Sequence, residues 1–289
     1  MPTARKLISI CIPAYNSERF IAETVDSVLR QTYHELELIV VDDCSPDGTF
    51  DVLRGYDDPR MRLYRNLVNI GAEKNWNKCL GLARGDYVKV LPGDDTLYPE
   101  CLERQAAVLD DPRNADVTFV YCARDVVDAE GRPVMKASFP GQGRIDRRTL
   151  TRKNVRHGMN TVGEPGAVLF RAAASRNIGG FDARLPYIVD LDYWTRLLTV
   201  GDAFALSETL CTFRLSNTNW SVVLGNARKT NYLEFIDCLA GKDDVGLTWL
   251  EVLAGKARTC VNEMLRKMVY RFIAVRIWAR ALLGWKKSW

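Results

Sequence analysis

The first 125 residues alternate between two hydrophobic periods, and this alternation limits the possible folds more than any other feature of the chain. Short apolar runs typical of buried strands are separated by stretches in which apolar residues recur at helical spacing. The strand-like runs are 7–12, 36–41, 61–65, 87–91 and 117–122, and the helical stretches are 17–31, 49–56, 72–84 and 98–109. Strands that alternate with helices predict a mainly parallel sheet with helices on both faces.

The pattern changes after residue 125. The remaining elements are predicted as a hairpin over 126–134 that turns at Glu130–Gly131, a polar loop with one short helix over 140–165, strands at 167–170 and 208–214, helices at 172–177 and 190–200, and an almost wholly helical segment from 226. We therefore expect a main α/β domain over residues 1–215 and a C-terminal helical region over residues 216–289. Ser17 is the expected N-cap of the first helix.

Composition is that of a globular protein. Hydrophobic residues make up 47% and charged residues 26% of the 289 residues, which excludes collagen, a coiled coil and disorder as the main state. The sequence has no apolar run of about 18 residues and no signal-peptide pattern at its start, so we expect a cytoplasmic protein. Eight isolated cysteines and two histidines argue against a zinc site and against a disulfide framework.

The charge is unevenly distributed. Residues 256–289 hold nine Lys and Arg against one Glu, which gives +8, so the rest of the chain carries −4 within an overall net charge of +4. A nucleic-acid-binding protein would need basic residues over a surface of its main domain. Nucleic acid is therefore not an expected partner.

Carboxylates follow two of the predicted strands. Asp42 and Asp43 end the second strand, and Asp94 and Asp95 follow the fourth. In a parallel sheet, ligands bind at the carboxyl ends of the strands. Carboxylates gathered there would repel one another unless a cation answers them, and hard oxygen ligands suit Mg²⁺ or Mn²⁺. The alternative is that each pair merely forms a turn or a helix cap.

Other phosphate-binding and hydrolytic motifs are absent from the sequence. It contains no G-x-G-x-x-G, no G-x-x-x-x-G-K-[ST] and no G-x-S-x-G. A dinucleotide-dependent oxidoreductase, a P-loop kinase and a serine hydrolase are therefore not supported.

Four segments in a fixed order resemble the inverting family 2 glycosyltransferases of the GT-A fold, over about residues 5–215. They are IPAYN (12–16), VDDCSPDGT (41–49), NIGAEKNWNKCLGLARGDYV (69–88) and LPGDD (91–95). The resemblance implies a GT-A, Rossmann-like α/β fold. It also implies that Pro13, Tyr15 and Asp43 hold the nucleotide base and that Lys74 lies near the diphosphate. Asp94 is implied to lie near the ribose or diphosphate, and Asp95 to bind the metal.

A second region resembles the family's middle and catalytic segments. Residues 163–166 (GEPG) and 179–182 (GGFD) are similar to the middle section, and residues 189–194 (VDLDYW) are similar to a Glu-Asp-x-Asp-Leu-Trp segment. The resemblance makes Asp190 the catalytic base, although Val189 replaces the preceding Glu, and Asp192 is the fallback base. The alternative is that Asp190 only caps the following helix.

The resemblance implies transfer of one sugar from a nucleoside-diphosphate sugar, with a UDP-sugar as the expected donor, to an acceptor hydroxyl by a metal-dependent hexosyltransferase-type enzyme. Mn²⁺ or Mg²⁺ is the implied cofactor. The Gln-x-x-Arg-Trp motif of processive synthases is missing from the sequence, which favours a single addition. A nucleotidyltransferase and a catalytically silent nucleotide-sugar-binding protein are the alternatives.

The C-terminal segment predicts a basic amphipathic helix. Apolar residues recur at helical spacing from Cys260 onward, and Trp278, Trp285 and Trp289 suit a boundary between water and lipid. Such a helix can lie on an anionic leaflet, so we expect a peripheral protein on the inner face of the plasma membrane that acts on a lipid-linked acceptor in cell-surface glycan assembly. The alternative is a helix packed on its own domain or on a second subunit.

Overall fold

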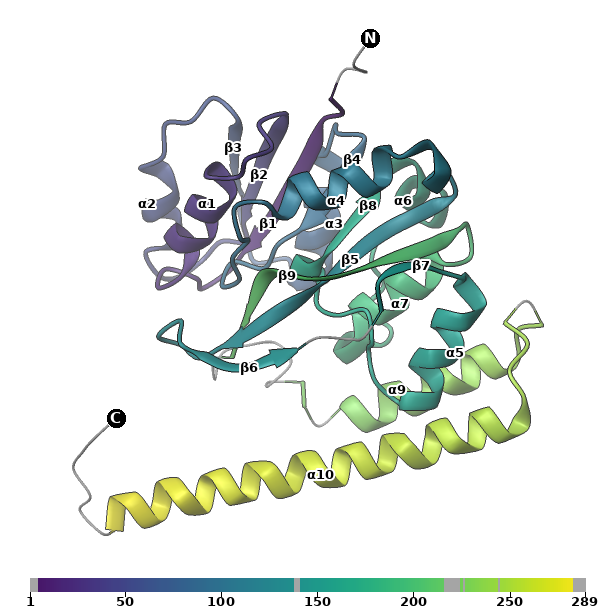
Figure 1. Cartoon of the computed structure of the whole chain (residues 1–289). Helices are drawn as coiled ribbons and strands as arrows, with labels where there is room; N and C mark the ends of the chain where they lie inside the picture. Colours follow the sequence, from purple (N-terminus) through teal and green to yellow (C-terminus); the bar gives the residue numbers. More distant parts are fainter. Residues whose placement is uncertain (1–4, 138–140, 216–223, 226, 244, 283–289) are drawn as a thin grey trace.

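The computed structural model describes residues 5–137, 141–215, 224–225, 227–243 and 245–282, without the side chains of 136–137, 267 and 269–282. One sheet of nine strands runs through the described chain in the order β3-β2-β1-β4-β8-β5-β9-β7, and β6 pairs with β5 (Figure 1). The strands are β1 Ile8–Ala14, β2 Leu36–Asp42, β3 Met61–Arg65, β4 Tyr87–Val90, β5 Val117–Val127, β6 Pro133–Ala137, β7 Gly143–Ile145, β8 Val168–Arg171 and β9 Asp202–Arg214.

Helices cover both faces of the sheet, as the sequence predicts. They are α1 Ile21–Leu29, α2 Thr49–Arg54, α3 Ala72–Leu82, α4 Cys101–Asp110, α5 Arg147–His157, α6 Ala172–Ile178, α7 Val189–Leu197, α9 Arg228–Ala240 and α10 Trp249–Leu282, with short 3₁₀ turns η1 Pro112–Asn114, η2 Pro165–Ala167 and η3 Pro186–Ile188. Alternate residues of β1 and β2 face two separate cores. One core includes α1 and α4, and the other includes α3, α6 and α7.

The first four strands position one edge of the sheet. β1 pairs in parallel with β2 on one side and with β4 on the other, and β3 extends the parallel pairing beyond β2. Parallel neighbours end at the same edge. The loops that follow β1, β2 and β4 therefore emerge side by side.

The second half of the sheet mixes directions. β8 is antiparallel to both β4 and β5, whereas β5 and β9 are parallel. β6 and β7 each add a short antiparallel pairing. The turn predicted at Glu130–Gly131 lies between β5 and β6, where the Gly131 amide donates to the Asp128 carbonyl.

Two local predictions are wrong. Ser17 does not cap α1: the helix begins at Ile21, and the Ser17 hydroxyl donates to the Tyr15 carbonyl at 3.1 Å, within the loop that follows β1. The segment predicted as a loop contains β7, which has only three residues. Its pairing with β9 and the ion pairs of Arg144 with Asp116 and Asp202 stabilise this edge, and such non-local contacts leave no periodic signal in the sequence.

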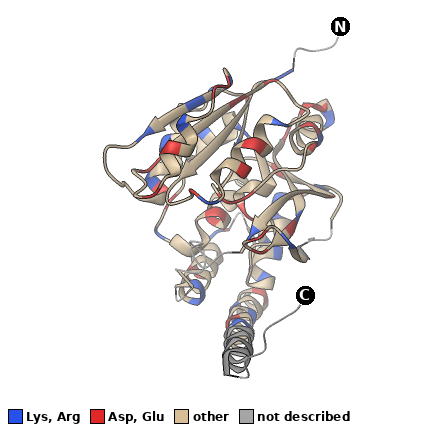
Figure 2. Ribbon diagram, turned by 90° about the vertical axis from the view of Figure 1, so that its left-hand side faces the viewer, with Lys and Arg blue, Asp and Glu red and all other residues tan. Residues whose placement is uncertain are grey.

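The described residues from Arg228 onward are mostly helical, in line with the helical segment predicted from 226, and form α9 and α10. α9 packs beside η3, and the side chains of α9, η3 and α5 share a third core. α10 contacts α9 and α5 and then continues below the sheet, away from the rest of the chain (Figures 1 and 2). Among the described helices none is both long enough and apolar enough to cross a bilayer. The side chain of Trp278, and Trp285 and Trp289 altogether, lie outside the described residues.

Candidate active site

The loops after β1 and β2 are joined to each other. The Asp43 amide donates to the Ala14 carbonyl at 2.8 Å, and the Asn16 amide donates to the Ser45 hydroxyl at 3.0 Å. Pro13 is partly buried, while Tyr15 is 50% exposed. An exposed aromatic ring beside a fixed backbone can stack on a planar base.

The Asp43 carboxylate is buried and fully engaged. It accepts hydrogen bonds from the Asn66 side chain at 2.7 Å and from the backbone amides of Ile70 and Gly71 at 2.9 and 3.0 Å. These donors compensate the buried charge and hold the chain that leads into α3. Asp43 therefore fixes the shape of this end of the site, whatever else it binds.

Two lysines of α3 lie near this part of the chain, and the role predicted for Lys74 stays a prediction. Lys74 lies exposed in the first turn of α3. Lys78, one turn further along the helix, donates to the Asn66 side chain at 2.6 Å and thus joins the Asp43 network.

Asp94 and Asp95 follow β4, next to the loop after β1. Asp95 is 1% exposed, and one of its oxygens accepts the Arg214 amide at 2.8 Å, whereas Asp94 is partly exposed. Burial raises the pKa of Asp94 to about 6, and burial together with the Asp94 charge raises the pKa of Asp95 well above its ordinary value. The accessible carboxylate of the pair is Asp94.

Glu164 links this pair to the predicted base. It precedes η2 and forms an ion pair with the buried Arg124. Its charge contributes to the raised pKa of Asp95 and also to that of Asp190, so it lies within electrostatic reach of both. Glu164 therefore connects the Asp94–Asp95 loop electrostatically to Asp190 at the start of α7.

Asp190 is the second residue of α7 and is partly buried. One oxygen accepts the Leu191 amide at 2.8 Å, and the other accepts the Asn160 side-chain amide at 2.9 Å. Burial, then Glu164, raise the pKa of Asp190 to about 7. A carboxylate with a pKa in this range is suited to accept a proton near neutral pH. The assignment of Asp190 as the base stays a prediction, and this pKa is one that the role requires.

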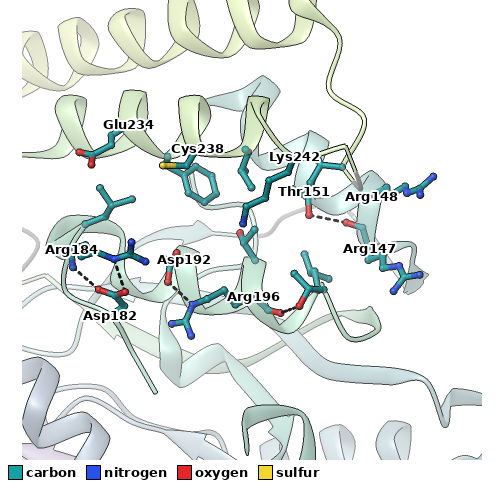
Figure 3. Close-up of a pocket in the computed structure, with 17 residues that line it drawn as sticks. Arg147, Arg148, Thr151, Asp182, Arg184, Asp192, Arg196, Glu234, Cys238 and Lys242 are labelled. Carbon is teal, nitrogen blue, oxygen red and sulfur yellow. Dashed lines mark hydrogen bonds and ion pairs between the residues drawn. The ribbon is translucent and has the colours of Figure 1, made fainter. Parts of the chain in front are cut away.

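Asp192, the fallback base, faces away from this site. Two residues along a helix correspond to about 200° of rotation, and the Asp192 carboxylate is paired with Arg196 at 2.7 Å. It lines a cavity of about 510 Å³ between α5, α7 and α9, where Lys242 and the Asp182–Arg184 pair also lie (Figure 3). The geometry favours Asp190 as the base.

A metal ion at this site would need a bound substrate to supply part of its coordination. Among the described residues, no group of three or more His, Cys, Asp and Glu side chains is arranged to hold an ion. When both are ionised, the two adjacent carboxylates of Asp94 and Asp95 nevertheless carry charge that the nearby Arg214 offsets only in part. Mg²⁺ commonly takes one or two carboxylates plus substrate phosphates. Asp94 and Asp95 fit that kind of ion.

Several residues at the site had no predicted role. Asn66 contacts Asp43, and Asn160 contacts Asp190. Arg214 contacts the loop that carries Asp94 and Asp95. Each comes from a distant part of the chain, and a single polar residue in a loop carries no pattern that identifies its partner. Glu164 stood in a family-like segment, but that likeness did not indicate its role.

Comparison with known proteins places the chain among glycosyltransferases. The family model described as "Glycosyl transferase family 2" matches residues 9–179. The uncharacterized protein MT1568 of Mycobacterium tuberculosis is 34% identical over 206 residues, which cover 68% of this chain and 63% of that protein. The putative teichuronic acid biosynthesis glycosyltransferase TuaG of Bacillus subtilis is 30% identical over 81% of this chain and 89% of its own length.

Solved structures share the fold. Staphylococcus aureus TarS 1-349 in complex with UDP-GlcNAc matches 88% of this chain and 71% of its own, with a TM-score of 0.67 and 20% identity. The mannosyltransferase PcManGT from Pyrobaculum calidifontis, in complex with GDP-Man and Mn²⁺, matches 99% of this chain and 82% of its own, with a TM-score of 0.63 and 18% identity. These likenesses confirm the GT-A fold.

The raised pKa of Asp190 predicts a pH-dependent stability difference. The unfolded chain releases this proton near pH 4 and the folded chain near pH 7, so the wild-type protein loses stability as pH rises between them. The variant Asp190→Asn lacks this loss. The stability of the variant relative to wild type should therefore be greater at pH 8 than at pH 5. We expect the difference between the two free energies of unfolding to change by on the order of 1–3 kcal/mol in favour of the variant, as measured by urea denaturation.

Asp47→Asn is the matched control for this measurement. The pKa of Asp47 is lowered below its ordinary value, so this group is ionised at both pH values and its variant should show the same difference at each. An Asp190→Asn difference that is equal at pH 5 and pH 8 would contradict the assignment.

Proposed function

The chain belongs to glycosyl transferase family 2, and from this we propose that it transfers one sugar from a nucleoside-diphosphate sugar to an acceptor hydroxyl with inversion. The observation that carries the proposal is that Glu164 lies within electrostatic reach of both Asp95 and Asp190, which come from two other segments of the chain, with Asp94 beside Asp95. A nucleotidyltransferase does not agree with the family match.

The donor would lie along the edge formed by the loops after β1, β2 and β4. Tyr15 supplies an exposed ring for the base, and the fixed loop around Asp43 supplies the surface beside it. TarS 1-349 was solved with UDP-GlcNAc and PcManGT with GDP-Man, which supports a nucleotide sugar as donor. We assign a UDP-sugar as the first donor to test.

Asp190 would accept the proton of the acceptor hydroxyl as its oxygen attacks the anomeric carbon. The bond from that carbon to the diphosphate oxygen breaks as the new bond forms on the opposite face. One base and one displacement invert the anomeric configuration, as in inverting glycosidases. The two hydrogen bonds to Asp190 hold its carboxylate in one orientation during this step.

Asp95, with Asp94 beside it, would hold a divalent ion, Mn²⁺ or Mg²⁺, which would act as a Lewis acid on the leaving diphosphate. The Mn²⁺ in the PcManGT complex supports this. Because Asp94 is the more exposed residue, its carboxylate is accessible to the donor as well.

The variant Asp190→Asn tests the assignment of the base. It keeps the size of the side chain but removes the proton acceptor, so kcat should fall by at least about 100-fold, while the affinity for the donor stays within about twofold because the donor does not need the base to bind. Transfer can be measured by release of the nucleoside diphosphate in the presence of acceptor. Unchanged turnover would exclude Asp190, and donor binding by a wild-type protein without any transfer would indicate a silent binding protein.

Thermal unfolding with a panel of UDP-, GDP- and dTDP-sugars should identify the donor and the need for metal. A ligand at 100 times its Kd stabilises the folded state by about 2.7 kcal/mol, which raises Tm by about 5–10 °C for a chain of this size. We expect one nucleotide to give this rise with Mn²⁺ and a smaller one with EDTA. Asp94→Asn and Asp95→Asn should each lose the Mn²⁺-dependent part, whereas the exposed Asp57→Asn should retain it.

Contact with a membrane surface is a second part of the proposal. On α10, the exposed apolar residues lie within about 160° of the helix circumference at 3.6 residues per turn: Trp249, Leu250, Leu253, Val261, Met264, Leu265 and Met268. The opposite side holds the helix to the domain, where Asn262 donates to the His157 carbonyl and Glu263 pairs with Arg228. An outward apolar face on a basic segment fits an anionic leaflet and would agree with a lipid-linked acceptor.

Removal of residues 264–289 tests the membrane proposal. The full chain should sediment with vesicles that contain anionic phospholipid. The shortened chain should remain in the supernatant, because it lacks part of the apolar face and most of the basic residues of the segment 256–289. Thermal stabilisation by the donor serves as a control that the shortened chain is folded. Equal sedimentation of the two chains would count against a membrane role and favour a second subunit.

A further inference from the structure

The Asp190 carboxylate is held by a side chain from a loop thirty positions earlier, that of Asn160. The Asn160 oxygen accepts the backbone amides of Val162 and Gly163, both at 3.0 Å. A backbone N–H can only donate, so the oxygen of the Asn160 side chain must face these two groups and its NH₂ must face Asp190. The orientation of this amide is thus fixed by the loop itself.

This donation favours the ionised form of Asp190. The Asn160 NH₂ contacts one carboxylate oxygen at 2.9 Å, and the Leu191 amide contacts the other at 2.8 Å. Hydrogen bonds to a charged acceptor are stronger than those between neutral groups. The pair of donors therefore sets both the direction of the carboxylate and its readiness to lose a proton.

Two consecutive residues of α9 hold the segments that carry this pair. The Tyr232 side chain is only 4% exposed, and its hydroxyl accepts a hydrogen bond from the backbone N–H of Asn160 at 2.8 Å. The Asn231 side-chain oxygen accepts the Tyr187 amide at 3.0 Å, in the 3₁₀ turn that leads directly into α7. One rigid helix thereby fixes the spacing between the loop of Asn160 and the start of α7.

We propose that Asn160 is the positioning residue of the catalytic base, and that α9 fixes the place of both residues through Tyr232 and Asn231. The inference rests on the proposed function, because it needs Asp190 to be the base. It assigns a catalytic purpose to a helix that lies beyond both the matched segment 9–179 and the main domain expected over 1–215.

The groups around Asp190 determine in which direction its pKa should move when one of them is removed. Glu164 faces it from the loop before η2 and raises its pKa, and the Tyr232 phenol faces it from α9, with Arg228 and Tyr187 around that ring. The Asn160 donation lowers the pKa of Asp190. Loss of the donor alone should therefore move the pKa of the base upward.

Asn160→Ala should reduce kcat by about 10- to 100-fold, the effect of a misplaced reacting group, with the KM for the donor within twofold of wild type. The rising limb of its pH–kcat profile should move to higher pH. Tyr232→Phe keeps the ring and its packing but removes the hydroxyl that accepts the backbone N–H of Asn160. This variant should therefore also lower kcat, by a smaller factor than Asn160→Ala.

Two matched substitutions serve as controls. Asn114→Ala removes an amide that donates to the Val108 carbonyl, and Tyr33→Phe removes a buried hydroxyl that donates to the Lys6 carbonyl. Both are at a distance from the site, and both should leave kcat and its pH profile unchanged. Circular dichroism and Tm of each variant show whether a loss of activity reflects unfolding.

A titration that does not depend on activity distinguishes the inference from the proposed function. The carboxyl signal of Asp190, in protein labelled with ¹³C at aspartate carboxyl carbons, is assigned with Asp190→Asn, and its midpoint should rise in Asn160→Ala. An unchanged midpoint with unchanged kcat overturns the positioning role while Asp190 remains the base. If Asp190→Asn retains turnover, the base assignment and this inference both fail. If Asn160→Ala does not fold, the kcat and midpoint of Tyr232→Phe decide the question, and wild-type values would overturn the role of α9.

Discussion

Parallel hydrogen bonding of β1 to both β2 and β4 is the constraint on which the rest of the site depends. Because the three strands run the same way, the loops that follow them emerge together, although they are far apart in the sequence. Tyr15, Asp43 and the Asp94–Asp95 pair are neighbours for this reason alone. The alternating side chains of β1 and β2 fill a core on each face of the sheet, so the register cannot slip by one residue without exposing both cores.

The carboxylates at this edge are stabilised in different ways, and the difference indicates their roles. Asp43 accepts three hydrogen bonds and acts as a fixed part of the fold. Asp94, Asp95 and Asp190 are less fully compensated, and burial raises the pKa of each. Negative charge that the protein does not neutralise by itself is what a cation-bound diphosphate and an incoming hydroxyl would use.

The sequence predicted the elements whose signal is local. The buried strands β2 and β4 match their predicted bounds closely, and the order of the four family-like segments indicated the fold. Ser17 failed as a helix cap because its hydroxyl is used by the loop after β1. β7 was missed because its three residues are stabilised by pairing with β9 and by Arg144 rather than by any periodicity of their own. The family resemblance, more than the spacing of residues, singled out Asp190 from among many aspartates.

The sequence by itself determined that strands and helices alternate, that acidic residues end two strands, and that the C-terminal segment is helical and basic. Only the tertiary structure decided that Glu164 lies within electrostatic reach of both Asp95 and Asp190, that Asp192 faces a different cavity, and that Asn231 and Tyr232 support the segments around the proposed base. The physical reason is that hydropathy and local propensity act between near neighbours along the chain. Hydrogen bonds and charge interactions across 30 to 72 positions form only when the packed helices and strands bring those side chains together.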